Sequence, residues 1–280
     1  IAEANKPVII AGQGVLASGS MDLLRELAEK AHIPVINSLL GLGSFPRNHE
    51  LSLGMMGMHG EATGTLAVQD ADLVMGVGIR FDDRLTGDTN TFAKNAKIVH
   101  FDLDPSEVGK TVTPVAWVIG DLKLGLEMLV PMVEPKRHDE WVAQVKGWQE
   151  AYPLVVPEGK FLSRTVLRAL NEHTKGQAIV STDVGQHQMW TAQFYKVMKP
   201  YHFISSGGLG TMGFGFPSAM GAKFAKPDSE VWCVVGDGGF QMTLQELQTA
   251  VEYGVKVNIC LLNNGYLGMV RQWQELFFDN

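Results

Sequence analysis

The chain has 280 residues, 45% of them hydrophobic and 19% charged, which is typical of a globular protein of about two domains and excludes collagen, coiled coil and disorder. Its net charge is −7, whereas proteins that bind nucleic acid usually carry an excess of basic residues. No apolar run reaches the ~18 residues of a membrane-spanning helix. We therefore expect neither nucleic acid nor a membrane as a partner. Cys233 and Cys260 lie in apolar runs typical of buried strands; a disulfide is one alternative, but a reduced chain is the favoured interpretation.

Both ends of the sequence are interpreted as cut. The chain begins at Ile1 without the basic region and long apolar stretch of a signal peptide, and it ends in an amphipathic segment without a capping residue. We therefore expect an internal piece of a longer protein.

The first half of the chain alternates short apolar runs with helical patterns. The helix predicted at Met21–Ala31 places Leu23, Leu24, Leu27 and Ala31 on one face. Such alternation indicates a parallel sheet covered by helices. The expected strands are Pro7–Ala11, Ile33–Asn37, Asp72–Gly78 and Lys97–Asp102, and a second helix is expected at Glu61–Asp70.

The segment from Pro131 to Lys160 has four prolines around a short helical pattern, Trp141–Trp148, and is interpreted as a linker. Residues 1–133 then form one domain, 134–160 the linker and 161–280 a second domain, both of the α/β class. In the second half, helices are expected at Phe161–Glu172 and Pro217–Ala225, and at a capping box of Thr243 and Glu246 that leads to Tyr253. Strands are expected at Ala178–Thr182, Val231–Val235 and Lys256–Leu262.

The most informative motif is the sequence GDGGF, which follows the strand Val231–Val235 and is followed by a second apolar strand that ends at Asn263–Asn264. Parallel strands deliver Asp237 and Asn264 to the same carboxyl edge, where open α/β sheets bind ligands. A carboxylate and an amide oxygen suit Mg²⁺ carrying a diphosphate, and glycines let the backbone approach a bulky anion. The plain alternative is a tight turn in which Asp237 caps the next helix.

The GDG…NN element resembles the signature of thiamine diphosphate (ThDP) enzymes. The flanking segments QELQTAVEYGV and NNGYLGMVRQWQE resemble the catalytic subunit of acetohydroxyacid synthase, also called acetolactate synthase. The same family is indicated by LGMMGMHG, GIRFDDRLTG, HFDLDPSEVGK, DVGQHQMW and SSGGLGTMGFGFPSAMGA, so that the resemblance covers nearly the whole chain. It implies two Rossmann-like domains, a FAD-binding middle domain and a C-terminally truncated ThDP domain.

The resemblance implies that Asp237, Asn264 and the backbone carbonyl of Tyr266 ligate Mg²⁺. Met212 would act as the wedge that bends ThDP and brings its amino group near the reactive carbon. The alternatives are that Met212 simply packs and that His187 is a core histidine. The expected ThDP contacts are Val184, Gly185, Gln186, His187, Gly210, Met212, Gly238, Gly239, Leu267, Gly268 and Met269.

Gly12–Gln13–Gly14 follows the first strand and precedes a helix, but it lacks the full dinucleotide-binding spacing and fits a plain turn equally well. Many relatives have three glycines here, so Gln13 departs from the family pattern. Asp102, at a strand end, is placed to accept a ribose hydroxyl. The FAD contacts implied by the resemblance are Gly12, Gln13, Gly14, Ser38, Leu39, Leu40, Met58, His59, Gly78, Arg80, Asp82, Arg84, Asp102, Leu103, Asp121, Gly207 and Gly208.

The run RFDDR could be a solvated salt-bridge loop, but the resemblance assigns Arg84 to the carboxylate of the second ketoacid. Met269 and Trp273 are four residues apart and share one face of a helix. Without the resemblance, such a pair would be interpreted as part of a hydrophobic core. In this family the two residues line the substrate channel, and the tryptophan favours 2-ketobutyrate over pyruvate as the acceptor. The expected catalytic residues are thus Met58, Arg84, Met212, Met269 and Trp273.

The implied reaction decarboxylates pyruvate on ThDP and condenses the hydroxyethyl group with pyruvate or 2-ketobutyrate, giving 2-acetolactate or 2-aceto-2-hydroxybutyrate for branched-chain amino-acid biosynthesis. FAD performs no net redox step in this family. The resemblance further implies a homodimer or homotetramer, a small regulatory subunit, and a cytoplasmic location, or a plastid or mitochondrion in a eukaryote.

Three alternatives stay open. Glyoxylate carboligase, pyruvate oxidase and the FAD-free acetolactate synthase also use ThDP, but RFDDR and Trp273 argue against them. A nicotinamide dehydrogenase built on the turn at Gly12 leaves the GDG…NN element unexplained. A non-catalytic, cofactor-binding piece is the third, and we expect this chain alone to be inactive because the family's activating glutamate comes from an N-terminal domain of a neighbouring subunit.

Overall fold

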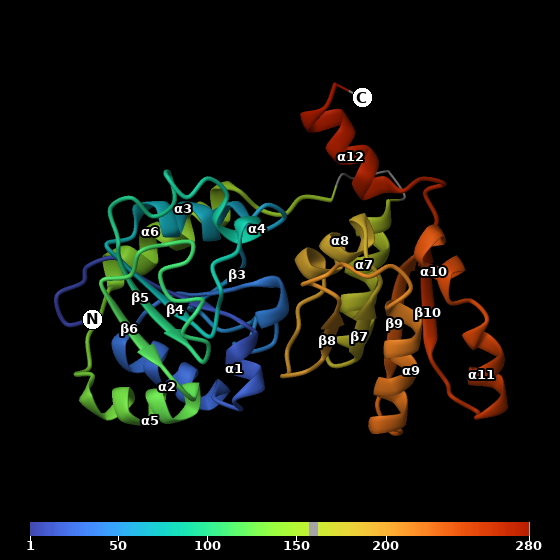
Figure 1. Cartoon of the computed structure of the whole chain (residues 1–280), viewed down its shortest axis with the longest axis horizontal. Coiled ribbons are helices and arrows are strands. Elements are labelled where there is room, and N and C mark those ends of the chain that lie inside the picture. Colours follow the sequence, from blue (N-terminus) through green and yellow to red (C-terminus); the bar gives the residue numbers. More distant parts are fainter. Residues whose placement is uncertain (157–161, 280) are drawn as a thin grey trace. The chain divides into compact units, whose positions relative to one another are not determined.

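The computed structural model describes residues 1–156 and 162–279. It divides into two compact units, Ile1–Val155 and Val156–Asn280, and each contains a wholly parallel sheet with helices on its faces (Figure 1). The predicted α/β class with two Rossmann-like parallel sheets is therefore confirmed. Within the described ranges, no helix has both the length and the apolarity that crossing a membrane requires.

The first unit has a six-stranded sheet in the order β3-β2-β1-β4-β5-β6. Ala11 at the end of β1 pairs with Asn37 of β2 on one side and with Val77 of β4 on the other. The direction of strand progression reverses between β1 and β4, and ligands of such sheets bind beside this point. The strands are β1 Pro7–Ala11, β2 Val35–Asn37, β3 Ser52–Met55, β4 Leu73–Val77, β5 Lys97–Asp102 and β6 Ala116–Ile119.

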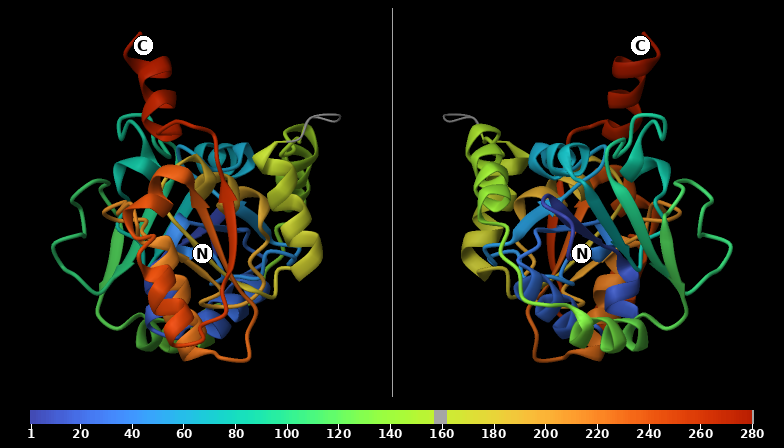
Figure 2. Two further views of the ribbon diagram at one scale, coloured as in Figure 1. Left: turned by 90° about the vertical axis from the view of Figure 1, so that its right-hand side faces the viewer. Right: turned by 90° about the vertical axis from the view of Figure 1, so that its left-hand side faces the viewer.

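Two hydrophobic cores cover the two faces of this sheet, and the helices of this unit can be followed in the further views of Figure 2. Ile9 packs with Leu24 and Leu27 of α2 and with Leu126 of α5 on one face. The next residue, Ile10, points to the other face, where α3 and α6 lie, because side chains alternate along a strand. The helices are α1 Gln13–Ala17, α2 Met21–Ala31, the 3₁₀ turn η1 Leu39–Gly41, α3 Ala62–Asp70, α4 Asp83–Thr86, α5 Leu122–Met132 and α6 Asp139–Ala151.

The segment interpreted as a linker contains α6, which packs onto the first unit. Trp141 is buried, and its indole Nε1 donates a hydrogen bond to the carbonyl oxygen of Pro7, 2.9 Å away. Gln149 donates to the carbonyl of Ser52. The first compact unit therefore reaches to Val155 rather than ending near residue 133.

The second unit has a four-stranded sheet in the order β10-β9-β7-β8. Phe216 and Ala219 of α9 pack against Ile179, Val231 and Cys233 on one face, while α8 also contacts β7 and β9 and is itself covered by α7. The strands are β7 Ile179–Thr182, β8 Phe203–Ser205, β9 Val231–Gly236 and β10 Asn258–Leu262. The helices are α7 Ser163–Thr174, α8 Gln186–Phe194, α9 Gly215–Ala225, α10 Asp237–Met242, α11 Glu246–Glu252 and α12 Gly268–Phe277.

One predicted helix start is wrong. Thr243 does not cap α11, because its hydroxyl donates to the carbonyl of Gly213 instead, and α11 begins at Glu246 after Gln245 without a side-chain cap. The helix expected from Phe161 begins at Ser163 among the described residues, and Phe161 itself lies outside them.

Candidate functional site

Asp237 and Asn264 lie at the carboxyl ends of adjacent parallel strands. Gly236, which precedes Asp237, is paired with Leu262 near the end of β10. Asp237 opens α10, and the Oδ1 atom of Asn264 accepts the backbone N–H of Tyr266 at 3.0 Å. The Nδ2 atom of Asn264 lies 3.4 Å from Oε1 of Gln186, at the start of α8. Three loops of the second unit thus meet at one edge of its sheet.

His187 lies on α8 beside this edge and is buried, with 7% of its surface exposed. Its ring packs against Gly185 and Gly236, where an added methyl group would approach ring atoms to about 3 Å. Burial lowers the pKa of His187 to about 4, although the charges of Asp183 and Asp237 act in the opposite direction. The imidazole is therefore neutral at pH 7, and its Nε2 atom has no hydrogen-bond partner among the described residues. Such an atom is suited to a polar ligand group.

The glycines after β9 have identifiable packing roles. Gly236 makes room for the ring of His187, and a methyl group at Gly239 would overlap with Oδ1 of Asp183. A methyl group at Gly238 would lie 3.2 Å from Cδ2 of Leu267 and 3.6 Å from Cε of Met212. The glycines were predicted to let an anion approach the backbone. Gly236 and Gly239 instead make room for the side chains of His187 and Asp183.

Asp183 was not predicted from the sequence as a site residue, yet it lies at the centre of this arrangement. It is completely buried at the end of β7, and its carboxylate accepts backbone N–H groups from Val184, Gly213 and Gly215. The available signal was its position directly after an apolar strand, the same position that Asp237 occupies after β9.

Met269 and Trp273 share one face of α12, as their spacing predicts, and both are half-buried. The ring of Trp273 contacts that of Phe277 with centroids 5.2 Å apart. Gln272, which lies between Met269 and Trp273 in the sequence, accepts a hydrogen bond from Gln186. This bond connects α12 to the sheet edge that carries Asn264.

In the first unit, the predicted nucleotide turn meets Gly78 at the point where the strand order reverses. The N–H of Gly14 donates to the carbonyl of Gly78 at 3.0 Å, and a methyl group at Gly14 would lie 2.7 Å from the Gly78 Cα atom. A methyl group at Gly12 would overlap with the Gly78 carbonyl. The glycines allow two loops to pack in contact, and Gln13 begins α1 with its side chain exposed.

Three of the expected FAD contacts already bind backbone N–H groups of their own loops. Ser38 accepts from Gly41, Asp102 accepts from Asp104, and Asp121 caps α5 by accepting from Leu124. Oδ2 of Asp102 also lies 3.6 Å from Nε2 of His100. These side chains stabilise the loops at the carboxyl edge of the sheet.

The expected residues Met58, His59 and Arg84 come together in the first unit. The N–H of Met58 donates to the carbonyl of Arg84 at 2.8 Å. Burial lowers the pKa of His59, and the positive charge of Arg84 acts in the same direction. Within RFDDR, Arg80 donates to Asp82 at 3.1 Å, and the Arg84 side chain is largely exposed. Nε of Arg84 lies 3.9 Å from Oδ1 of Asp83, and a guanidinium can bind a carboxylate through two hydrogen bonds.

The expected catalytic residues divide between the units, with Met58 and Arg84 in the first and Met212, Met269 and Trp273 in the second. The expected FAD contacts divide likewise, because Gly207 and Gly208 lie after β8 while the others belong to the first unit.

The donor set at the edge of the second unit suits Mg²⁺ bound to a diphosphate. In the described part of the chain, no group of three or more His, Cys, Asp or Glu side chains could hold a metal. Asp237 and Asn264 offer one carboxylate and one amide oxygen, a set that suits a hard cation which takes its other ligands from phosphate and water. The orphaned Nε2 atom of His187 offers a further polar contact.

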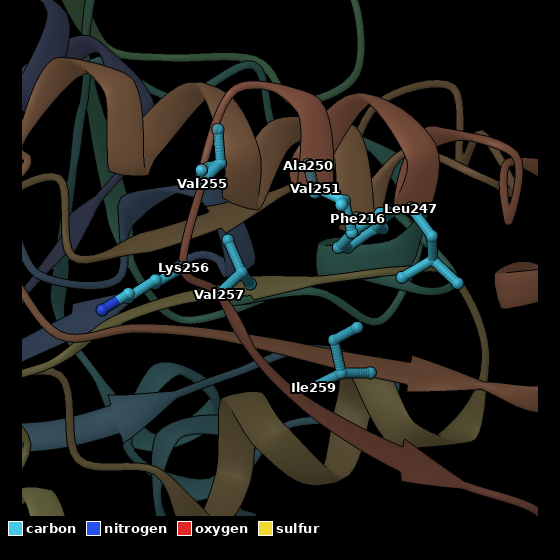
Figure 3. Close-up of a pocket in the computed structure, with 9 residues that line it drawn as sticks. Phe216, Leu247, Ala250, Val251, Val255, Lys256, Val257 and Ile259 are labelled. Carbon is cyan, nitrogen blue, oxygen red and sulfur yellow. The ribbon is translucent and has the colours of Figure 1, made fainter.

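An apolar groove of about 330 Å³ lies elsewhere in the second unit, between α9, α11 and the segment that leads into β10 (Figure 3). Phe216, Leu247, Val251 and Ile259 line it, with Lys256 at its border. It includes none of the predicted site residues, and Lys256 is the only ionisable side chain among the described residues that line it.

Comparisons with known proteins agree with the resemblance seen in the sequence. Residues 1–129 match the family model described as the central domain of thiamine pyrophosphate enzymes, and residues 183–280 match that of their C-terminal TPP binding domain. Thiamine pyrophosphate is another name for ThDP. The two matches follow the two compact units.

Similar proteins include the acetolactate synthase large subunits of Corynebacterium glutamicum, 46% identical over all of this chain and 46% of that protein, and of Lactococcus lactis, 45% identical over 99% of this chain and 48% of that protein. An acetolactate synthase of Mycobacterium bovis is 45% identical over 99% of this chain. The chain spans about half the length of these curated relatives. On these similarities and its two parallel-sheet units, the chain belongs to the thiamine pyrophosphate enzyme family and is homologous to acetolactate synthase large subunits.

Proposed function

We propose that the protein to which this chain belongs is an acetohydroxyacid synthase that converts two pyruvates to 2-acetolactate, or pyruvate and 2-ketobutyrate to 2-aceto-2-hydroxybutyrate. The observation that carries the proposal is the edge at which Asp237, Asn264 and the orphaned His187 meet, in a chain similar along its length to acetolactate synthases. This edge offers ligands for a cation and for a diphosphate. An enzyme that catalyses this reaction needs both kinds of ligand to bind ThDP.

In this proposal Asp237, Asn264 and the backbone carbonyl of Tyr266 hold Mg²⁺. Gln186, His187 and the N–H groups at the start of α10 contact the diphosphate, because a neutral imidazole and main-chain donors can bind phosphate oxygens. Further contacts are assigned to Val184, Gly185, Gly210, Met212, Gly238, Gly239, Leu267, Gly268 and Met269. When bound, ThDP supplies the carbanion chemistry that removes CO₂ from a ketoacid and joins the remaining two-carbon unit to a second one.

The first unit is assigned to FAD. Gly12, Gly14 and Gly78 pack against one another where the strand order reverses, which is the usual place for a dinucleotide in such sheets. The loops of Ser38, Asp102 and Asp121 lie along the same edge, and the remaining assigned contacts are those predicted from the sequence.

Each unit contains residues that are assigned to a substrate. The exposed guanidinium of Arg84 would bind the carboxylate of the second ketoacid, since it can form two hydrogen bonds to one carboxylate. Within the second unit, Trp273 and Met269 would bound a pocket for a ketoacid side chain. We further propose a homodimer or homotetramer with a small regulatory subunit, acting in the cytoplasm or in an organelle of a eukaryote.

The test is product formation by the full-length protein with pyruvate, Mg²⁺, ThDP and FAD. The proposal expects 2-acetolactate, and 2-aceto-2-hydroxybutyrate when 2-ketobutyrate is added, with flavin absorbance present and no transfer of electrons from pyruvate to an acceptor. Oxidation of pyruvate, or condensation of glyoxylate instead of pyruvate, would assign the protein to another ThDP enzyme.

A further inference from the structure

The buried carboxylate of Asp183 joins two loops of the second unit. Its Oδ1 atom accepts the N–H of Val184 at 2.9 Å and the N–H of Gly213 at 3.1 Å, and its Oδ2 atom accepts the N–H of Gly215 at 2.8 Å. Val184 belongs to the loop between β7 and α8, whereas Gly213 and Gly215 lie some thirty residues later, at the start of α9. One side chain therefore fixes the end of the glycine-rich loop that contains Met212.

Gly213, the residue that follows Met212, is held from two sides. The N–H of Gly213 donates to Asp183, and the carbonyl of Gly213 accepts the hydroxyl of Thr243 at 3.1 Å. Gly213 has a φ of +87°, and a methyl group there would lie 2.9 Å from Cβ of Met242, so that the loop fits tightly at this point. The conformation of the loop, and hence the direction of the Met212 side chain, depends on these two hydrogen bonds.

Met212 reaches from this loop toward the start of α10. Its Cε atom would lie 3.6 Å from a methyl group placed on Gly238, the residue after Asp237. Two glycines make room for Asp183. A methyl group at Gly215 would come within 2.6 Å of the Asp183 backbone nitrogen, and one at Gly239 would overlap with the Asp183 carboxylate.

We propose that Asp183 is a positioning residue for the ThDP site, which holds the loop 210–215 so that Met212 faces the cofactor assigned to the start of α10. The inference rests on the proposed function for the identity of that cofactor. The hydrogen bonds require a carboxylate, since both oxygens accept N–H groups, and an asparagine would turn an NH₂ group toward one of the donors. Asp183 does not contact the reacting atoms and acts through Met212.

The first test needs no cofactor and uses amide hydrogen exchange. Asp183→Asn keeps the size of the side chain but leaves Gly213 or Gly215 without its acceptor, so exchange of these amides should rise about tenfold or more, while the amides of β7 and β9 keep their rates. The matched control is Thr182→Val, which removes the hydrogen bond between the hydroxyls of Thr182 and Ser205 on the same strand and should leave the loop unchanged. Unchanged exchange at both glycines in Asp183→Asn would overturn the inference.

The second test measures the full-length protein with Mg²⁺. Asp183→Asn should change the Kd for ThDP less than threefold, because the carboxylate binds the N–H groups of Val184, Gly213 and Gly215 and not the groups assigned to the diphosphate. It should lower kcat about tenfold or more, whereas a merely structural role would change both or neither. If this variant does not fold, Thr243→Val should lower kcat as well, since Thr243 is half-buried and its hydroxyl binds the carbonyl of the same residue, Gly213. An unaltered kcat in a variant whose loop exchanges faster would refute the positioning role. Failure of the unmutated protein to bind ThDP would instead reject the proposed function, and the positioning role with it.

Discussion

Acid should destabilise the second unit through His187, and the size of the effect can be estimated from the structure. Burial lowers the pKa of His187 from its ordinary 6.5 to about 4 in the folded protein, while the unfolded chain keeps the ordinary value. Between these values the unfolded state binds more protons, so stability is fully present above pH 6.5 and is lost as the pH falls toward 4. At roughly 1.4 kcal/mol per pKa unit, His187 accounts for a loss of about 3 kcal/mol.

The perturbation is His187→Asn, whose side chain does not titrate. Native-state hydrogen exchange of the β7 and β9 amides, recorded from pH 7 to pH 4, reports the free energy of opening this unit. The variant should lose about 3 kcal/mol less than the unmutated protein over this range. Burial also lowers the pKa values of His32, His59 and His202, so some acid sensitivity remains in both proteins. Equal pH dependence in the two proteins, or an NMR titration of His187 with a midpoint near pH 6.5, would refute the reasoning.

Three further predictions concern the substrate pocket and the first unit. Trp273→Leu in the full-length protein should reduce the preference for 2-ketobutyrate over pyruvate roughly ten- to a hundred-fold in a competition assay, and an unchanged product ratio would remove Trp273 from the pocket. Gly14→Ala should lower the free energy of unfolding in urea by about 1–3 kcal/mol, because the added methyl group would collide with the backbone of Gly78. The control Gly147→Ala, on α6 with open space around it, should raise the free energy of unfolding by about 0.5–1 kcal/mol. Equal effects of the two substitutions would contradict the close packing at Gly14. Trp141→Phe should destabilise the same unit by about 1 kcal/mol through loss of its hydrogen bond to β1, and unchanged stability would show that α6 contributes little.

Two strands that the sequence predicts with the structure's own bounds lie inside the sheet, with a neighbour on each side. Pro7–Ala11 is apolar and buried along its whole length, as is typical of a central strand of a parallel sheet, and Lys97–Asp102 has its apolar residues between polar ends. The short strands β3 and β6 were not predicted. Ser52–Met55 contains a glycine with a φ of +78°, and Ala116–Ile119 is exposed along its length at the edge of the sheet. Neither carries the pattern of a central strand.

The positions of Asp237 and Asn264 could be predicted because each follows an apolar strand, and adjacent parallel strands end at the same edge. Asp183 follows an apolar strand too, but its partners are backbone N–H groups about thirty residues away, which no local pattern reveals. The same holds for Thr243, whose spacing from Glu246 predicts a helix cap although a tertiary contact uses its hydroxyl. Helix propensity and residue spacing report only on neighbours along the chain. The roles of Asp183 and Thr243 depend instead on hydrogen bonds to residues distant in the sequence.

The most direct measurement is calorimetric titration of ThDP into the full-length protein, with Mg²⁺ and with a chelator. We expect binding that requires Mg²⁺ and that Asp237→Ala abolishes, while the same variant still binds FAD, because the flavin is assigned to the first unit. Binding of ThDP with equal affinity in Asp237→Ala and the unmutated protein, or with equal affinity in the absence of Mg²⁺, would contradict the assignment of Asp237 and Asn264 to the metal.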